Sequence, residues 1–176
     1  LFKTQRQIDT ASLPAAGEKL AILQHTIERL TAAGYVYIGM DHFARPDDEL
    51  AVAQREGSLY RNFQGYSTHA DCDLVAMGIT AIGKVGDSYS QNVKTLDEYS
   101  ALLDGGRMPV FRGIVLSADD KLRRAVITQL ICHFELNYAR IEHTFNVRFR
   151  DYFAAELDAL QAMQADGLLE VGAHSI

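Results

Sequence analysis

Apolar residues recur at helical spacing in two long segments of the chain. Within residues 18–33 they come every three or four positions, and Gly34 follows where a helix would end. Within residues 117–134 apolar side chains recur every four positions, beginning at Leu122. Each pattern gives a helix one apolar side that can pack against a core. The sequence therefore predicts a helix over each segment.

Shorter runs predict strands between the helices. β-Branched and aromatic residues gather at 35–38, 60–67 and 111–116, which is typical of strands. Start and stop signals predict further helices over 46–57 and 95–105. Because helices and strands alternate along this part of the chain, we expect βαβ units and a parallel sheet.

The last third of the chain has a different character. A short helix is expected near 139–145 and a long one near 149–165, and residues 168–171 are expected to begin a strand. Three helices followed by a strand resemble a winged helix. We therefore predict two domains, residues 1–116 and residues 117–176.

Composition narrows the classes of function. The 176-residue chain is 48% apolar and 23% charged with a formal net charge of −6, a balance typical of globular proteins. Residues 117–176 contain six Lys or Arg and nine Asp or Glu, so the winged-helix-like part lacks the basic face that meets phosphates. No apolar run reaches membrane-spanning length. We expect neither a nucleic-acid partner nor a membrane partner.

Cysteine usage points to a reducing compartment. The chain has two Cys, at positions 72 and 132, which is typical of a cytoplasmic protein rather than a disulfide scaffold. Two Cys cannot by themselves hold an iron–sulfur cluster or a structural zinc ion. We therefore assign no metal ligands in this chain and expect a cytoplasmic location.

Polar residues follow the first predicted strand. Asp41 and His42 suit an acid–base or ligand role, although a capping Asp and a gap-filling His explain an isolated pair more simply. Arg45 and Arg61 suit an acidic ligand because a guanidinium matches a carboxylate. Salt bridges to the acidic residues at 47–49 are the alternative for both arginines.

Residues 63–66 combine an aromatic face, an amide and a glycine, which suits a flat or purine-bearing ligand. The alternative is an edge of the core with one exposed amide. The glycines from 78 to 86 match neither a P-loop nor a dinucleotide fingerprint. Ile82 would instead form the apolar wall of a pocket.

Five collinear motifs together resemble a known family. They are GMDHFARPDDEL at 39–50, RNFQGY at 61–66, GDSYSQN at 86–92, FRGI at 111–114 and ICHF at 131–134. The order and residues of these motifs are similar to the oxygen-independent coproporphyrinogen III oxidases, radical S-adenosylmethionine enzymes of heme biosynthesis. The resemblance extends over essentially the whole chain.

The resemblance implies a fold and an activity. The fold would be the last elements of an incomplete TIM-like (β/α) barrel, followed by a mainly helical, winged-helix-like C-terminal domain. The activity would be oxidative decarboxylation of two propionates of coproporphyrinogen III, giving protoporphyrinogen IX. It would use S-adenosylmethionine, a [4Fe–4S] cluster and an electron donor protein, in a cytoplasmic enzyme that is a monomer at full length.

One departure from the family limits what the chain could do. The Cys-x-x-x-Cys-x-x-Cys motif that holds the cluster in the family is absent from these residues. We therefore expect a C-terminal fragment that is inactive alone. An open barrel would expose a sheet edge, so we also expect the fragment to associate with itself.

Residue roles are carried over from the matching motifs. The resemblance implies contact with a second S-adenosylmethionine for Phe63, Gln64 and Ile82. Contact with the propionate-bearing substrate is the corresponding expectation for Asp41, His42, Arg45 and Arg61, and no catalytic residue is assigned. Two alternatives stay open: a heme chaperone of the same superfamily and a winged-helix interaction module.

Overall fold

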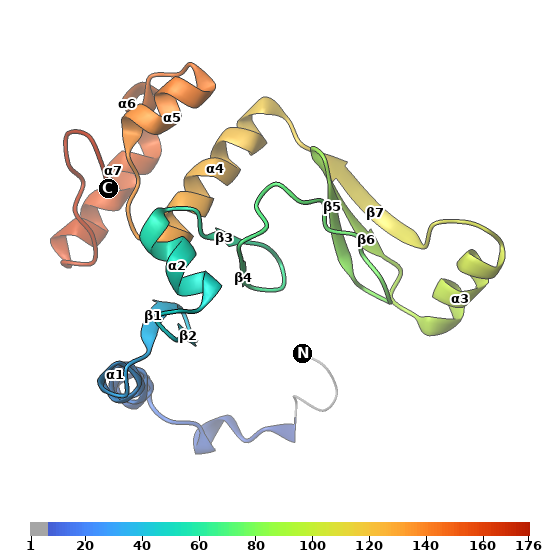
Figure 1. Ribbon diagram of the computed structural model, residues 1–176, viewed down its shortest axis with the longest axis horizontal. Helices are drawn as coiled ribbons and strands as arrows, with labels where there is room; N and C mark the ends of the chain where they lie inside the picture. The colour runs from blue at the N-terminus through green and yellow to red at the C-terminus, as the bar shows by residue number, and fades with distance from the viewer. Residues whose placement is uncertain (1–6) are drawn as a thin grey trace. The chain divides into compact units, whose positions relative to one another are not determined.

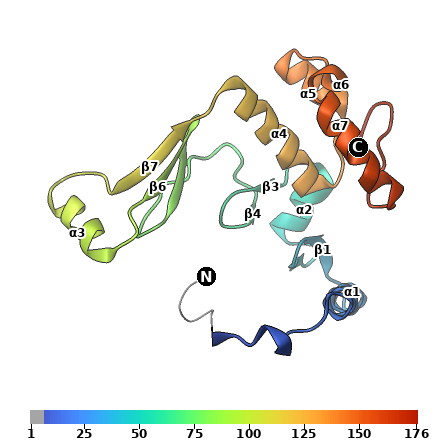
Figure 2. The same cartoon turned by 180° about the vertical axis from the view of Figure 1, so that it is seen from behind.

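The computed structural model describes residues 7–176 and is shown from two sides in Figures 1 and 2. The chain forms two compact units that divide between Val52 and Ala53. Before this division lie the 3₁₀-helix η2 (Thr10–Ser12), α1 (Ala16–Ala32), β1 (Val36–Gly39) and β2 (His42–Ala44), and α2 (Glu49–Glu56) spans it. The second unit holds β3 (Tyr60–Arg61), β4 (Tyr66–Ser67), β5 (Ile82–Val85), β6 (Ser88–Asn92), α3 (Leu96–Asp104), β7 (Val110–Val115), α4 (Ala118–His133), α5 (Tyr138–Phe145), α6 (Phe149–Tyr152) and α7 (Ala154–Ala165).

The predicted helix near residues 18–33 is present as α1. Glu18 lies in its first turn and Arg29 in its last, where their charges oppose the helix dipole. The helix ends before Gly34, whose φ of +89° is a left-handed conformation that suits glycine. None of the α1 side chains is buried, and Leu20 is 65% exposed. The apolar stripe therefore forms a helix without being covered by the described residues.

The first predicted strand turns back at once instead of leading into a helix. β1 pairs with β2 in an antiparallel hairpin, with Tyr37 opposite Phe43. Met40 closes the hairpin with a φ of +54°, and its carbonyl oxygen accepts a hydrogen bond from the Tyr37 hydroxyl. Ile38 is fully buried.

The prediction of a parallel sheet is wrong. In the part of the chain that the structure describes, all strands pair antiparallel: β1 with β2, β3 with β4, and β5 with β6 and then β7. The physical reason is that short turns connect most neighbouring strands; Gly86, with a φ of +53°, lies in the turn between β5 and β6. The predicted strand over 60–67 is likewise the short hairpin β3–β4.

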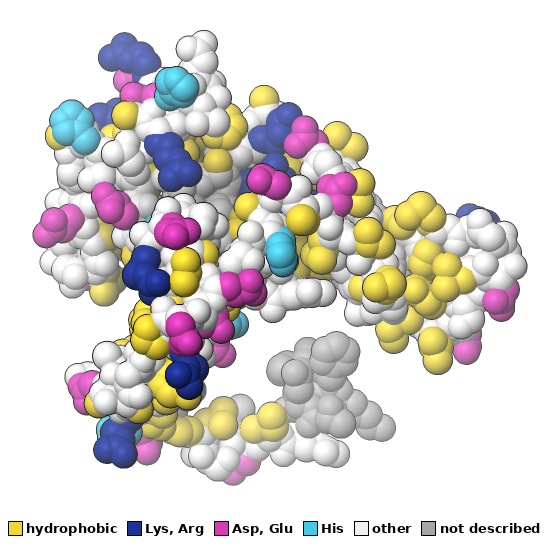
Figure 3. All heavy atoms as spheres, viewed as in Figure 1, with side chains coloured by type: hydrophobic (Ala, Val, Ile, Leu, Met, Phe, Trp, Pro, Cys, Tyr) yellow, Lys and Arg dark blue, Asp and Glu magenta, His cyan; other side chains and the backbone are white. Residues whose placement is uncertain are grey.

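α3 joins β6 to β7 and lies at the end of the three-stranded sheet away from α4 (Figures 1 and 2). It ends at Gly105 and Gly106, as the sequence predicts. Every residue of β7 is exposed. Figure 3 shows hydrophobic side chains gathered over the part of the molecule formed by this sheet and α3. The exposed hydrophobic residues of β7 are Val110, Phe111, Ile114 and Val115.

The C-terminal helices hold a core of seven buried residues: Leu122, Leu136, Tyr138, Ile141, Phe149, Phe153 and Leu157. α4 begins with a capping box between Ser117 and Asp120. The long helix expected near 149–165 is divided at Phe153 into α6 and α7. Phe134 does not continue the apolar stripe of α4, because it caps the helix with a φ of +56° and is 62% exposed.

The strand expected at residues 168–171 is absent from the described structure. The chain pairs further on instead, where Leu136 and Ile176 exchange backbone hydrogen bonds of 2.8 and 3.1 Å. The barrel and winged-helix descriptions, and the domain boundary before residue 117, stay predictions. In the part of the chain described, no helix combines the length and apolar character needed to cross a membrane.

Candidate functional site

Two pockets of the second unit meet at one aromatic pair. The first, which we call the sheet pocket, has a volume of about 380 Å³ and is lined by residues that include Phe63, Ile82, Tyr89, Gln91, Arg112 and Ile114. The second, which we call the helix pocket, has a volume of about 560 Å³ and lies among β3, β5, β6 and α4. Phe63 and Tyr89 line both pockets, with their rings edge to face at a centroid distance of 5.4 Å. Both volumes lie in the range of small-molecule sites.

Asn62 fixes the hairpin that carries Phe63. Its side-chain oxygen accepts hydrogen bonds from the backbone N–H groups of Gln64 and Gly65, at 2.8 and 3.3 Å. Such a turn needs a short side chain that can bond to the following backbone. The Tyr66 hydroxyl donates to the Ile131 carbonyl oxygen at 3.1 Å, which attaches the hairpin to α4.

Asn92 fixes the glycine-rich segment that precedes Ile82. Asn92 is 2% exposed, and its side-chain amide donates to the carbonyl oxygens of Gly78 at 2.9 Å and Ala76 at 3.4 Å. The Gly78 N–H in turn donates to the Tyr99 hydroxyl at 2.9 Å. Two side chains that follow this segment in the sequence, Asn92 and Tyr99, therefore hold its backbone in place.

The sheet pocket has an apolar wall and a polar edge. Phe63, Ile82 and Ile114 supply the wall. At the edge, the Arg112 guanidinium donates to the Gln91 side-chain oxygen at 3.0 Å, and the Gln91 amide donates to the Thr80 carbonyl oxygen at 3.1 Å. This combination suits a flat, mostly apolar group that also makes a few directed hydrogen bonds.

The structure brings together two of the three residues predicted to bind cofactor. Phe63 and Ile82 line the same pocket although they are far apart in sequence. Gln64 is exposed at the tip of the β3–β4 hairpin and does not line either pocket. Its role, like those of Phe63 and Ile82, stays a prediction.

Arg61 lies in the helix pocket. Its guanidinium carbon is 4.8 Å from the centre of the Tyr66 ring, and its Nη1 atom is buried without a hydrogen-bond partner among the described residues. A buried donor without an acceptor is costly, and because this atom is closed to solvent it belongs to the protein interior and not to the surface of the pocket.

The other three predicted substrate residues lie in the first unit. The His42 Nδ1 atom is 2.8 Å from a carboxylate oxygen of Asp41, whose side chain is 87% exposed. The Arg45 guanidinium is 3.3 Å from the carboxylate of Asp47, so the local salt bridge considered for Arg45 is present. Their contact with substrate stays a prediction.

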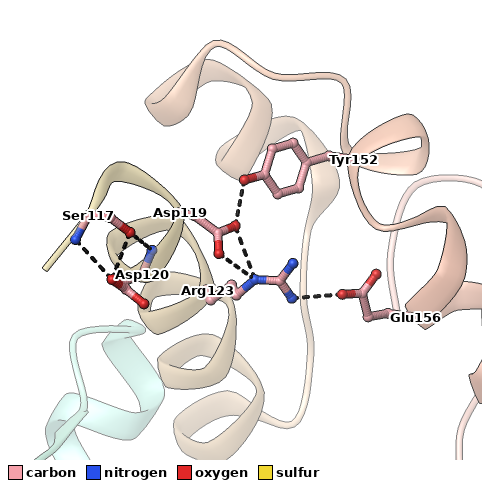
Figure 4. Close-up of polar contacts among 6 residues, drawn as sticks. All are labelled: Ser117, Asp119, Asp120, Arg123, Tyr152 and Glu156. Carbon is pink, nitrogen blue, oxygen red and sulfur yellow. Dashed lines mark hydrogen bonds and ion pairs between the residues drawn. The ribbon is translucent and has the colours of Figure 1, made fainter.

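A network of four side chains joins α4 to α6 and α7 (Figure 4). Arg123 donates to Asp119 at 2.9 Å and to Glu156 at 2.7 Å, and the Tyr152 hydroxyl donates to Asp119 at 2.5 Å. The bond from Tyr152, followed by that from Arg123, lowers the pKa of Asp119. The same bond raises the pKa of Tyr152. Because Arg123 also lines the helix pocket, this network positions one wall of it.

The described residues include no cluster of three or more His, Cys, Asp or Glu side chains that could hold a metal ion. Cys72 is exposed and Cys132 is buried on α4. Burial raises the pKa of Cys132 to about 11, against a smaller opposing effect of Arg61. Neither thiol is placed to form part of a metal site with other described residues.

Comparisons with known proteins identify the relationship. Residues 116–176 match the HemN C-terminal domain family. The oxygen-independent coproporphyrinogen III oxidase of Pseudomonas aeruginosa is 53% identical over 175 residues, which is 99% of this chain and 38% of that protein. Over nearly its whole length this chain is similar to part of the oxygen-independent coproporphyrinogen III oxidases. The resemblance inferred from the five motifs is thereby confirmed.

A second sequence and a solved structure show the same similarity. The oxidase of Escherichia coli K12 is 53% identical over 176 residues, covering 100% of this chain and 38% of that protein. The solved structure of the Escherichia coli coproporphyrinogen III oxidase (HemN), described as a radical SAM enzyme, superposes with a TM-score of 0.92 at 52% identity. The superposition covers 99% of this chain and 40% of that one, which confirms the mixed α/β fold. The chain spans about two fifths of the length of these oxidases.

Sequence reasoning did not single out Tyr89 and Asn92 as separate site residues. Both lie in the GDSYSQN motif, so the signal that could have found them was already part of the resemblance. Arg124 and Ile127, which line the helix pocket from α4, lie in none of the five motifs, and only the fold brings α4 beside β3.

Proposed function

We propose that this chain forms the C-terminal part of an oxygen-independent coproporphyrinogen III oxidase. The full-length protein, meaning a polypeptide of the relatives' length that carries this chain, would convert two propionates of coproporphyrinogen III to vinyl groups. Each conversion removes carbon dioxide, one hydrogen atom and one electron from the propionate. The observation that carries the proposal is the 0.92 TM-score at 52% identity to a radical SAM oxidase over 99% of the chain.

The sheet pocket is the proposed place where this chain meets S-adenosylmethionine. The S-adenosylmethionine bound at the cluster would supply the radical that removes hydrogen from the propionate, and the molecule in the sheet pocket would be the second S-adenosylmethionine that the resemblance implies. Phe63 and Ile82 would pack against its apolar surfaces, and the Gln64 amide would donate or accept hydrogen bonds at the hairpin tip. The role of these residues is to bind and orient rather than to transfer electrons.

The remaining components of the reaction are proposed to lie outside this chain. The [4Fe–4S] cluster requires ligands that residues 7–176 do not bring together. The electron donor protein would deliver its electron to that cluster. The isolated chain is therefore expected to form no 5′-deoxyadenosine, and formation of this product by the isolated chain would contradict the proposal.

Arg61, together with Asp41, His42 and Arg45, is proposed to contact the substrate. Arg45, Arg61 and, when it is protonated, His42 are cations, which suit a molecule that carries four propionates. We also propose that the full-length protein is a cytoplasmic monomer, and that the isolated chain associates through its exposed β7 face.

A chimera tests the proposed function. The matched region of the Escherichia coli oxidase is replaced by these 176 residues, and anaerobic extracts are assayed for protoporphyrinogen IX, with the unaltered oxidase as the control. We expect vinyl product from the chimera. A folded chimera that cleaves S-adenosylmethionine yet decarboxylates no propionate would overturn the proposal, and heme binding without turnover would favour a heme chaperone.

A further inference from the structure

We infer that the helix pocket binds one propionate-bearing pyrrole of the substrate, with Arg61 and Lys84 as its carboxylate-binding pair. This inference rests on the proposed function for the identity of the ligand. The chemistry by itself requires a carboxylate attached to a flat apolar body. The helix pocket shares the Phe63–Tyr89 pair with the sheet pocket.

The walls of the helix pocket suit the apolar body. Tyr60, Phe63 and Tyr89 contribute aromatic rings, and Leu74, Ile127 and Ile131 contribute aliphatic side chains. The volume of about 560 Å³ accepts a substituted pyrrole and part of the ring beside it, while the rest of a tetrapyrrole would extend beyond the opening.

The charges of the pocket suit a carboxylate. Four cationic side chains line it, Arg61, Lys84, Arg123 and Arg124, against the single carboxylate of Asp120. Asp120 is already engaged, because it accepts hydrogen bonds from the N–H and the hydroxyl of Ser117 at 2.9 and 2.7 Å. The lining is therefore positively charged overall, and an anion is stabilised there.

Two of these four cations lack a carboxylate partner among the described residues. Arg123 is paired with Asp119 and Glu156, and Arg124 lies 3.9 Å from Asp87. Lys84 has only a carbonyl oxygen, that of Ala70 at 3.4 Å. Its ammonium also lies 5.2 Å from the centre of the Tyr60 ring.

Arg61 contributes a second cation without a carboxylate partner to the lining. Its Nη1 atom is closed to solvent, so the charge of the guanidinium, and not that atom, acts on a ligand in the pocket. A carboxylate in the pocket would be stabilised by the charges of Arg61 and Lys84. These two side chains come from β3 and β5, so the pair is built by the fold and not by neighbouring sequence.

The charge also decides which of two carboxylates enters. S-adenosylmethionine has a carboxylate, but its sulfonium and ammonium groups make the molecule positive overall. The helix pocket, with four cationic side chains, therefore disfavours it more than the sheet pocket, whose one charged lining residue is Arg112. Coproporphyrinogen III carries four propionates and no cation. The substrate is therefore the ligand of the helix pocket, and S-adenosylmethionine belongs to the sheet pocket.

Binding of coproporphyrin III, the stable oxidised form with the same four propionates, tests the inference in the full-length protein. Arg61→Gln and Lys84→Met are compared with Arg107→Gln, a control at an exposed position that lines neither pocket. We expect roughly tenfold to hundredfold weaker binding for each pocket variant, as for loss of a charge-assisted hydrogen bond, and no change for the control. Two pocket variants are used so that the test still gives an answer if one of them fails to fold.

The outcomes separate this inference from the proposed function. If both pocket variants bind coproporphyrin III as tightly as Arg107→Gln, the inference is wrong even when the unaltered protein forms product. If the variants instead lose S-adenosylmethionine affinity, the carboxylate belongs to the cofactor and the inference is again wrong. If they lose porphyrin affinity in a protein that forms no vinyl product, the pocket assignment stands and the proposed activity fails.

Discussion

The rings of Phe63 and Tyr89 pack edge to face, 5.4 Å apart, and this pair forms a shared wall of two pockets. Phe63 comes from the tip of a hairpin and Tyr89 from the middle strand of the three-stranded sheet. One pocket has a polar edge on the sheet, and the other has a cationic lining on α4. On our proposal, cofactor and substrate meet at this aromatic pair.

Replacement of Phe63 tests the cofactor side of the wall. In the full-length protein, Phe63→Ala is expected to weaken S-adenosylmethionine binding roughly tenfold, because an apolar contact surface is lost. Equilibrium dialysis with labelled cofactor measures the change. Phe111→Ala is the matched control, since Phe111 is an exposed aromatic residue on β7 outside both pockets. Equal effects of the two substitutions would remove Phe63 from the cofactor site.

Asn92 is predicted to stabilise the fold as well as the site. Asn92→Leu leaves the carbonyl oxygens of Ala76 and Gly78 without their donor inside a buried segment. We expect the free energy of unfolding to fall by about 1–3 kcal/mol. Urea denaturation measures it, with Ser100→Ala on the exposed side of α3 as the control. A variant as stable as the control would show that the glycine-rich segment does not depend on Asn92.

The network on α4 predicts how stability changes with pH. The pKa of Asp119 is lowered in the fold, so its contribution is present above the unfolded pKa near 4 and is lost as pH falls through the folded value. The pKa of Tyr152 is raised, so its contribution is complete below about pH 10 and is lost as pH rises through the folded value. Stability from this pair is therefore greatest between these limits.

Thermal unfolding from about pH 2 to pH 7 checks the acidic limit. Tm of the unaltered chain should fall more steeply below about pH 4 than Tm of Asp119→Asn, which has no carboxylate to protonate. Asp158→Asn, at an exposed position on α7, is the control and should follow the unaltered chain. Parallel curves for all three proteins would mean that Asp119 contributes nothing to the pH dependence.

The two cysteines should differ sharply in reactivity. Burial raises the pKa of Cys132 to about 11, so at neutral pH it is both shielded and protonated, whereas Cys72 is exposed. Iodoacetamide followed by mass spectrometry should find one modified cysteine in the native chain and two after denaturation. Rapid modification of native Cys132 would show that α4 opens away from the β3–β4 hairpin.

Local signals predicted the helices well, because their causes lie within a few residues. The Ser117–Asp120 capping box and the glycines after α1 and α3 each act on neighbouring backbone. The parallel sheet was wrong because alternation of helices and strands does not show whether a chain crosses over or turns back. The chain turns back at Met40 and at Gly86, each of which has a left-handed backbone conformation. A pattern of hydrophobic residues does not predict such a conformation.

The candidate site was predictable only where motifs carried it. Phe63 and Ile82 came from the resemblance, and the structure then brought them to one pocket. Lys84 had no signal of its own, because a lysine in a strand is ordinarily exposed to solvent. Lys84 and Arg61 line one pocket because of how β3, β5 and α4 pack, which depends on contacts between residues far apart in the sequence.

Product analysis of the full-length protein tests the central claim most directly. The protein is incubated without oxygen with a reductant, S-adenosylmethionine and coproporphyrinogen III, and the porphyrinogens and 5′-deoxyadenosine are separated and measured. We predict protoporphyrinogen IX together with 5′-deoxyadenosine, and neither product from the isolated 176-residue chain. Cleavage of S-adenosylmethionine with coproporphyrinogen III left unchanged would contradict the proposed oxidase activity.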